Sequence, residues 1–241
     1  FIAEPITGAS GVIVPPQGYY QKVQTVLNKY GIMFWADEVI TGFGRTGSDF
    51  GCTTMGIESP DMMTFAKQLS SAYMPISASA IRRDIYDAMI EQTANAGAFG
   101  HGYTYSGHPV ACAVALKTQE IFQRDQIFEQ AAITGEYLQK RLAEFAGHPL
   151  VGEVRGRGLL GAIELVANKQ TGEPFVGGAV GGYAQKMAQD NGLLIRAVAG
   201  SSLGFCPPLI ITNAQIDEMM AIVALALDGT LQYCHKENLL V

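Results

Sequence analysis

Short apolar runs that each end in a charged residue most constrain how this chain of 241 residues can fold. The run Ile32–Ala36 precedes Asp37, and the run Met63–Ala66 precedes Lys67. Apolar runs of this length, bounded by turn residues, are typical of buried strands. In an open α/β sheet, ligands bind outside the carboxyl ends of the strands. We therefore expect Asp37 and Lys67 to lie at two strand ends and to share one site.

The segment before the first of these strands predicts a helix. Helical spacing of apolar residues extends from about Gln17 to Tyr30, and Gly31 stands where helices commonly end. Phe1–Pro5 reads as the end of a buried strand. The order strand, helix, strand predicts parallel pairing of the strands and an α/β fold.

The composition excludes several classes of protein. Hydrophobic residues make up 48% of the chain and charged residues 16%, which is typical of a globular fold. The net charge is −6 and no basic patch stands out, so we expect no nucleic-acid partner. No apolar run approaches the length of a membrane span, so we expect no membrane partner. No stretch reads as a signal peptide, and the cysteines are scattered, which together predict a cytoplasmic protein with free thiols.

An acid and a lysine in one site suggest a particular chemistry. A lysine in apolar surroundings favours its neutral, nucleophilic amine and can form a Schiff base with a carbonyl compound. Pyridoxal 5'-phosphate carries an aldehyde and a pyridine nitrogen. An acid beside that nitrogen keeps the ring protonated, so that the ring accepts electrons. Taken singly, however, an aspartate or a lysine is more often structural or exposed than functional.

Several motifs, in order along the chain, resemble the class III (fold type I) pyridoxal-phosphate-dependent aminotransferases. They are Glu4-Pro5, Asp37-Glu38-Val39, Lys67, His101–Pro109, Asn191–Arg196 and Phe205–Pro208. Ala72–Ala78 is similar to the version found in amine and ω-amino-acid:pyruvate transaminases. The resemblance spans nearly the whole chain and matches the C-terminal part of the family's chain. The family's phosphate-binding turn and ring-stacking aromatic residue would precede Phe1.

The resemblance implies the fold of a type I PLP-transferase in two parts. Residues 1–126 would be the C-terminal part of the large, mostly parallel-sheet PLP-binding domain. Residues 127–241 would be a linking helix and a small α+β C-terminal domain. Within the second part, the sequence predicts a strand pair in 151–166, a helix over 178–191 and a short strand at Leu193–Ile195. It also predicts a last helix that opens with the capping box Thr212-x-x-Gln215.

The resemblance also gives roles to single residues. Lys67 would hold the cofactor as a Schiff base and serve as general base and then acid. Asp37 would pair with the pyridine nitrogen, and Val39 would pack on one face of the ring. Thr104 would donate a hydrogen bond to the cofactor phosphate of the neighbouring subunit, which implies a homodimer. Arg196 would hold a substrate carboxylate and swing out when an apolar amine occupies the site.

The residue at position 9 narrows the substrate class. Family members of the ornithine and 4-aminobutyrate type have a segment that resembles Glu-Pro-Ile-Gln-x-Glu here. Their second glutamate pairs with the substrate-binding arginine, which corresponds to Arg196, when that arginine holds no carboxylate. Glu4–Ala9 has an alanine in that place, as the pyruvate-dependent amine transaminases have a small residue. We therefore expect a transaminase that moves an amino group from an amine or ω-amino acid to an α-keto acid in two half-reactions. Pyruvate is the acceptor that we expect.

Other interpretations remain open at this point. Gly42–Gly47 is a literal G-x-G-x-x-G after a strand, which is the fingerprint of dinucleotide-binding oxidoreductases. Its first glycine does not follow the strand directly, and Ser48–Cys52, which follows its last glycine, is not a helix start with an apolar face. His101 and His108 lack further ligands at a suitable spacing, so we expect no metal site. An aminomutase or racemase on the same fold, and an inactive fragment, are the remaining alternatives.

Overall fold

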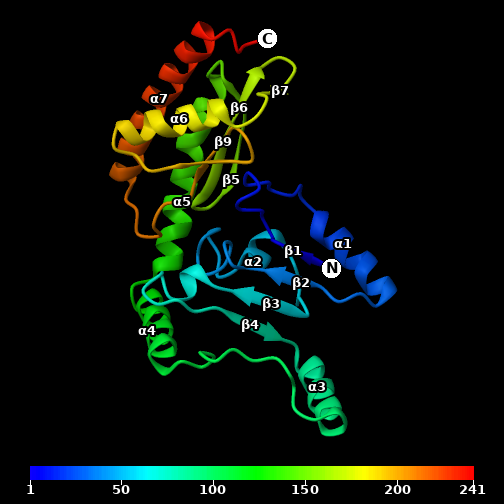
Figure 1. The fold of residues 1–241 in the computed structure, drawn as a ribbon. Coiled ribbons are helices and arrows are strands. Elements are labelled where there is room, and N and C mark those ends of the chain that lie inside the picture. Colours follow the sequence, from blue (N-terminus) through cyan, green and yellow to red (C-terminus); the bar gives the residue numbers. More distant parts are fainter.

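The computed structural model describes all 241 residues, which build two sheets (Figure 1). The strands of the first sheet lie in the order β1-β2-β3-β4. They are Ile2–Ala3 (β1), Trp35–Asp37 (β2), Met62–Phe65 (β3) and Ala78–Ile81 (β4). β2 pairs in parallel with both β1 and β3, whereas β4 is antiparallel to β3. The parallel pairing predicted from the order strand, helix, strand is confirmed.

Four α-helices belong to this part of the chain. They are Tyr19–Tyr30 (α1), Gly51–Met55 (α2), Arg83–Ala96 (α3) and Pro109–Arg124 (α4), and a 3₁₀ helix covers Lys67–Leu69 (η1). Gly31 ends α1 in a left-handed conformation, as predicted. Tyr20 and Leu27 of α1 pack with Phe34 and Ala36 in a small core beside β2. Figure 1 shows α3 at the end of the molecule opposite α7.

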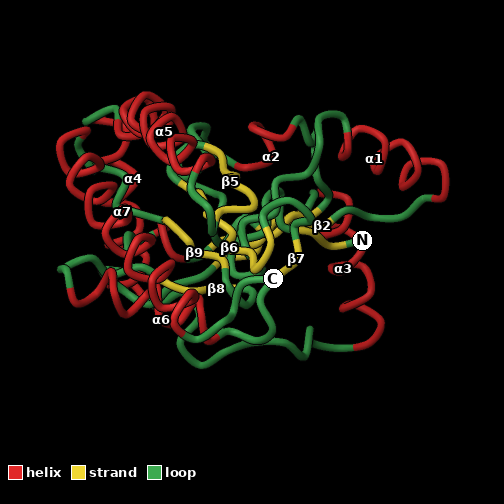
Figure 2. The backbone as a smooth tube through the Cα atoms, turned by 90° about the horizontal axis from the view of Figure 1, so that it is seen from above, coloured by secondary structure: helices red, strands yellow, loops and turns green.

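The second sheet is antiparallel and has the order β5-β6-β9-β8, with β7 paired to β6. Its strands are Val151–Arg157 (β5), Leu160–Asn168 (β6), Glu173–Pro174 (β7), Arg196–Val198 (β8) and Ser202–Phe205 (β9). The helices are Ile127–Ala143 (α5), Ala179–Asp190 (α6) and Asn213–Lys236 (α7), with a 3₁₀ helix at Glu144–Gly147 (η2). Figure 2 shows α5, α6 and α7 on one side of these strands.

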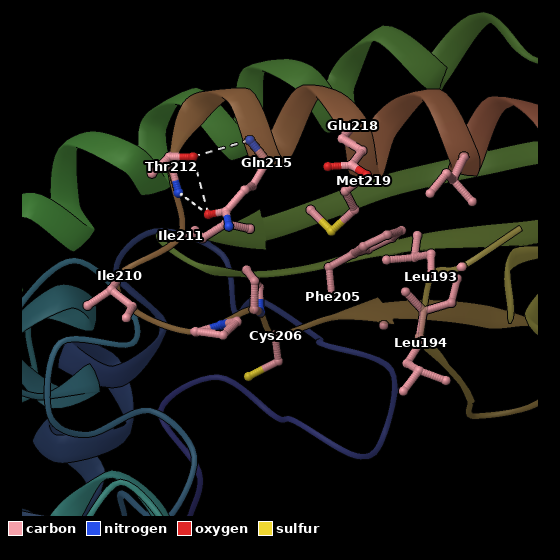
Figure 3. A pocket seen from close by; sticks show the side chains of 16 residues that line it. Leu193, Leu194, Phe205, Cys206, Ile210, Ile211, Thr212, Gln215, Glu218 and Met219 are labelled. Atoms are coloured by element: carbon pink, nitrogen blue, oxygen red, sulfur yellow. Dashed lines mark hydrogen bonds between the residues drawn. The ribbon is translucent and has the colours of Figure 1, made fainter.

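The last helix follows its sequence signals closely. The Thr212 side chain accepts a hydrogen bond from the Gln215 backbone N–H, and the Gln215 side chain accepts one from the Thr212 backbone (Figure 3). This is the predicted capping box, which satisfies N–H groups that the first turn of a helix leaves free. The apolar face of α7 is fully buried against α5 and the second sheet through Ile216, Met220, Val223 and Leu227.

The predicted strand at Leu193–Ile195 is wrong. These residues have no regular structure, and β8 begins at Arg196, which pairs with Gly204 of β9. The apolar run suggested a buried strand, but Leu194 is 82% exposed and the run lines a surface pocket instead. Arg196 is therefore the first residue of a strand and does not follow one.

The turn between β5 and β6 joins the two sheets. Its residue Leu159 donates a backbone hydrogen bond of 3.0 Å to the carbonyl oxygen of Arg45, in the glycine-rich segment after β2. Gly158 has a φ of 58°, and a Cβ at this position would lie 2.4 Å from the carbonyl carbon of Thr46. Glycine is required here because any side chain would push the turn away from the glycine-rich segment. None of the helices has the length and apolar character needed to cross a membrane.

Candidate active site

Asp37 and Lys67 lie at adjacent ends of two parallel strands. Asp37 is the last residue of β2 and stands beside Thr64 of β3 in the register of the sheet. The backbone N–H of Glu38 extends this pairing with a hydrogen bond of 3.0 Å to the Thr64 carbonyl oxygen. Lys67 follows β3 and begins η1. The arrangement places both side chains at the carboxyl edge of the first sheet, where ligands bind in α/β folds.

The backbone of Lys67 adopts a left-handed conformation. Its φ is 41°, and Ser71 and Ala72 in the turn that follows also have positive φ values. Such conformations are unfavourable for residues with a Cβ and concentrate at functional sites. Lys67 is exposed. The residues of this chain therefore do not provide the apolar surroundings that were expected around its amine from the sequence. Lys67 instead lines a cavity.

Asp37 keeps one carboxylate oxygen available. Its Oδ1 accepts a hydrogen bond of 3.0 Å from the backbone N–H of Val39, and Oδ2 has no partner within the chain. Both residues are half-buried. The bond to Val39 fixes the carboxylate in one orientation, which leaves Oδ2 free to accept a proton donor from a bound molecule.

A cavity of about 360 Å³ is lined by residues from both parts of the chain, at Lys67. Lys67 lines it with Arg196, the first residue of β8, and with Ala9, in the loop after β1. The cavity thus joins the predicted cofactor lysine with the predicted carboxylate-binding arginine. Asp37 and Val39 lie outside its lining, and so does Thr104, which is exposed in the turn before α4.

A larger pocket of about 680 Å³ lies on the side of the second sheet (Figure 3). It contains Leu193, Phe205 and Met219 but neither Lys67 nor Arg196. Figure 3 shows Leu194 and Cys206 extending away from Phe205 and Met219, and these two residues also line the Lys67 cavity. We assign the chemistry to the smaller cavity, because it holds the nucleophile and the free cation.

The buried carboxylate of Glu38 was not singled out from the sequence. Glu38 is fully buried and accepts hydrogen bonds from the Thr41 hydroxyl (2.5 Å), the Gly51 N–H (2.9 Å) and the Cys52 N–H (2.6 Å). It therefore ties the glycine-rich segment and the start of α2 to the residue next to Asp37. The only feature of the sequence that could have pointed to Glu38 is its place in the acid–Glu–Val motif.

Two arginines that link the sheets were also missed. Arg45 is 4% exposed and donates from Nη1 to the carbonyl oxygens of Leu159 (3.1 Å) and Pro207 (2.5 Å). Arg155 of β5 donates from Nε to the carbonyl oxygen of Gly11 (2.8 Å) and pairs with Glu164. Both arginines bind backbone groups that are distant in sequence, so no local pattern could identify them.

The comparisons with known proteins identify the family of the chain. The family model for class III aminotransferases matches residues 1–227. A putrescine–pyruvate aminotransferase from Pseudomonas aeruginosa is 49% identical over 231 residues, which are 95% of this chain and 49% of that protein. A gamma-aminobutyrate transaminase from Solanum lycopersicum is 45% identical over 231 residues, which are 95% of this chain and 44% of that protein.

Solved structures give the same result. The omega transaminase from Pseudomonas jessenii, solved in complex with PMP, has a TM-score of 0.93 and 46% identity; the match covers 97% of this chain and 51% of that one. An engineered thermostable omega transaminase has a TM-score of 0.94, which confirms the fold type I architecture expected from the sequence. The chain spans about half the length of the relatives it matches. By sequence and by structure, the chain belongs to the class III aminotransferase family.

Proposed function

We propose that the protein is a pyridoxal-phosphate-dependent transaminase that moves an amino group from an amine or ω-amino acid to pyruvate. The observation that carries the proposal is the cavity shared by Lys67 and Arg196, in a chain of the class III family. A similar protein that covers nearly all of this chain is a putrescine–pyruvate aminotransferase. Ala9 lines the cavity and supplies no acid that would pair with Arg196.

The residues of the site suit pyridoxal phosphate. The cofactor's aldehyde needs an amine, and the Lys67 amine is exposed at the cavity. Its pyridine nitrogen needs a hydrogen-bond acceptor with a negative charge, and Asp37 Oδ2 lies at the adjacent strand end without a partner. Lys67 would thus hold the cofactor covalently, Asp37 would bind the ring nitrogen, and Val39 would pack on the ring.

The residues of this chain would divide the work between two half-reactions. When bound, the cofactor supplies an electron sink for the electrons released at the donor carbon. Within the first half-reaction the Lys67 amine would take the proton from that carbon as general base and give it to the cofactor as general acid, and in the second half-reaction it would carry a proton the opposite way. The Arg196 guanidinium binds the carboxylate of pyruvate with two hydrogen bonds. Because Arg196 is exposed, it can point into water when an apolar amine occupies the cavity.

The assembly and the division into domains follow from the same proposal. Thr104 is exposed and lies outside the Lys67 cavity of its own chain. This position supports a homodimer in which Thr104 donates to the cofactor phosphate of the partner subunit. We place the domain boundary after Gln126, between α4 and α5, where the chain passes from the first sheet to the second. Residues 1–126 and 127–241 are then the two domains.

Measuring the two half-reactions separately tests the proposed function. The purified holoenzyme is mixed first with putrescine alone and then, after the amine is removed, with pyruvate alone. The cofactor absorbance should change with the amine and return with pyruvate, and alanine should form in an amount equal to the bound cofactor. An aminomutase or racemase would give no such transfer between two substrates. Absence of alanine, with cofactor bound, would contradict the proposal.

A further inference from the structure

Arg45 is a buried cation with no acidic partner. Its side chain forms no ion pair, although arginine is rarely buried unless it is paired. Its positive charge faces two carbonyl oxygens, those of Leu159 and Pro207, which both accept from Nη1. Burial lowers the pKa of Arg45 below its ordinary value. The protein therefore bears an unfavourable desolvation at this position, which points to a function for the guanidinium.

The two carbonyl oxygens belong to the segments that form the second sheet's side of the cavity. Leu159 lies in the turn between β5 and β6, and its N–H donates back to the Arg45 carbonyl oxygen. Pro207 follows Phe205 and Cys206, which line the same cavity as Lys67. Residue Gly204, at the end of this segment, pairs with Arg196 in the sheet. Arg45 thus connects the loop after Asp37 with the strand pair that carries Arg196.

We infer that Arg45 is a positioning residue that sets the distance between Lys67 and Arg196. The inference rests on the proposed function and names a determinant of its carboxylate-binding step. Arg45 lines the cavity together with Lys67 and Arg196, but its Nη1 is committed to the backbone. Without it, two carbonyl oxygens lose their donor, and the segment that carries Arg196 can move away from Lys67. Arg196 is then displaced from the position in which it binds the carboxylate of pyruvate.

The variant Arg45→Met removes the charge and the donors and keeps most of the side-chain volume. The variant Arg45→Lys keeps a cation that can donate to both carbonyl oxygens. Arg157→Met is the matched control, because Arg157 is exposed at the end of β5, beside the turn that holds Leu159, and makes no side-chain hydrogen bond or ion pair. If Arg45→Met gives no folded protein, Arg45→Gln replaces it, since glutamine removes the charge but keeps an amide NH₂ that can donate.

Two measurements on the holoenzyme decide the inference. In Arg45→Met, hydrogen exchange should quicken at the Leu159 N–H and in the segment that follows Pro208, and KM for pyruvate should rise tenfold or more. The amine half-reaction should change less than threefold, and Arg45→Lys should restore KM. Equal losses in both half-reactions, failure of lysine to restore KM, or unchanged exchange would each overturn the inference. The exchange result does not depend on catalysis, so it stands apart from a failure of the proposed function.

Discussion

Lys67, in the turn after the first sheet's β3, and Arg196, in the second sheet, line the same cavity of about 360 Å³. Lys67 follows β3 of the first sheet, and Arg196 begins β8 of the second. The chemistry proposed for the protein requires both, because one residue handles protons at the reacting carbon and the other binds a carboxylate. The way in which the two sheets join therefore decides whether the site works.

Replacing Arg196 with alanine should separate the two half-reactions. In the proposed function the guanidinium binds the carboxylate of pyruvate, so the rate of that half-reaction, as kcat/KM, should fall at least about tenfold, or about 1.4 kcal/mol. The half-reaction with an apolar amine such as a 1-arylethylamine should change little. Rapid-mixing measurements of the cofactor absorbance with each substrate alone provide the test.

Arg157→Ala serves as the control for this experiment, since Arg157 is exposed and has no partner in the chain. An equal fall in both half-reactions would mean that Arg196 has a structural role. No fall in either would mean that another residue binds the carboxylate.

Replacing Asp37 with asparagine should reduce turnover strongly. Asparagine keeps the shape of the side chain but removes the negative charge that would hold the pyridine nitrogen in its protonated form. Loss of electrostatic stabilisation of this kind costs about 3 kcal/mol or more, so kcat should fall by at least about a hundredfold. Steady-state kinetics measure the effect. Asp49→Asn, at an exposed position in the following loop, is the control, and near wild-type turnover in Asp37→Asn would exclude the role.

Elements with strong local signals were predictable from the sequence. The end of α1 is capped by Gly31 and the start of α7 by Thr212, because a glycine in the left-handed region and a capping box act within a few residues. The strand predicted at Leu193–Ile195 failed because an apolar run does not say whether a partner strand is present. Arg196 could still be singled out as a candidate, because the family motif fixes the residue and not its secondary structure.

The support of the site could not be predicted in the same way. Glu38 accepts hydrogen bonds from the backbone of Gly51 and Cys52, and Arg45 donates to carbonyl oxygens in the turn between β5 and β6 and in the segment after β9. These bonds join a side chain to backbone groups, which every residue has, so the sequence carries no sign of the partner. The exposure of Lys67 was missed because burial depends on the tertiary contacts around a strand end.

Replacing Glu38 with alanine should destabilise the fold. The change leaves the Thr41 hydroxyl and the backbone N–H groups of Gly51 and Cys52 without an acceptor in a buried setting. Each buried donor without a partner costs about 1–3 kcal/mol, so the free energy of unfolding should fall by about 3 kcal/mol or more. Urea unfolding measures this loss. Glu58→Ala, at an exposed position, should have little effect, and equal stability of the two variants would contradict the account.

His148 should make stability depend on pH. Burial lowers the pKa of its imidazole below the ordinary value, and the opposing effect of the Asp228 carboxylate is smaller. Its Nδ1 accepts a hydrogen bond of 3.2 Å from the Leu150 N–H, which requires an unprotonated nitrogen. The unfolded chain thus binds the proton more readily. The contribution to stability is complete above the ordinary pKa of about 6.5 and is lost as the pH falls through the lower pKa of the folded state.

Thermal unfolding at about pH 7.5 and about pH 5.5 tests this dependence. The original protein should lose more stability on acidification than His148→Gln, because glutamine does not take up a proton. The same loss in both proteins would assign the pH dependence to other groups.

Borohydride reduction of the holoenzyme tests the central claim most directly. Reduction makes the bond between the cofactor and its lysine permanent, so that the labelled peptide can be isolated and sequenced by mass spectrometry. We expect all of the label on Lys67, at the turn after β3, and none in Lys67→Ala. Label on Lys22, Lys29 or any other lysine would contradict the assignment of the site.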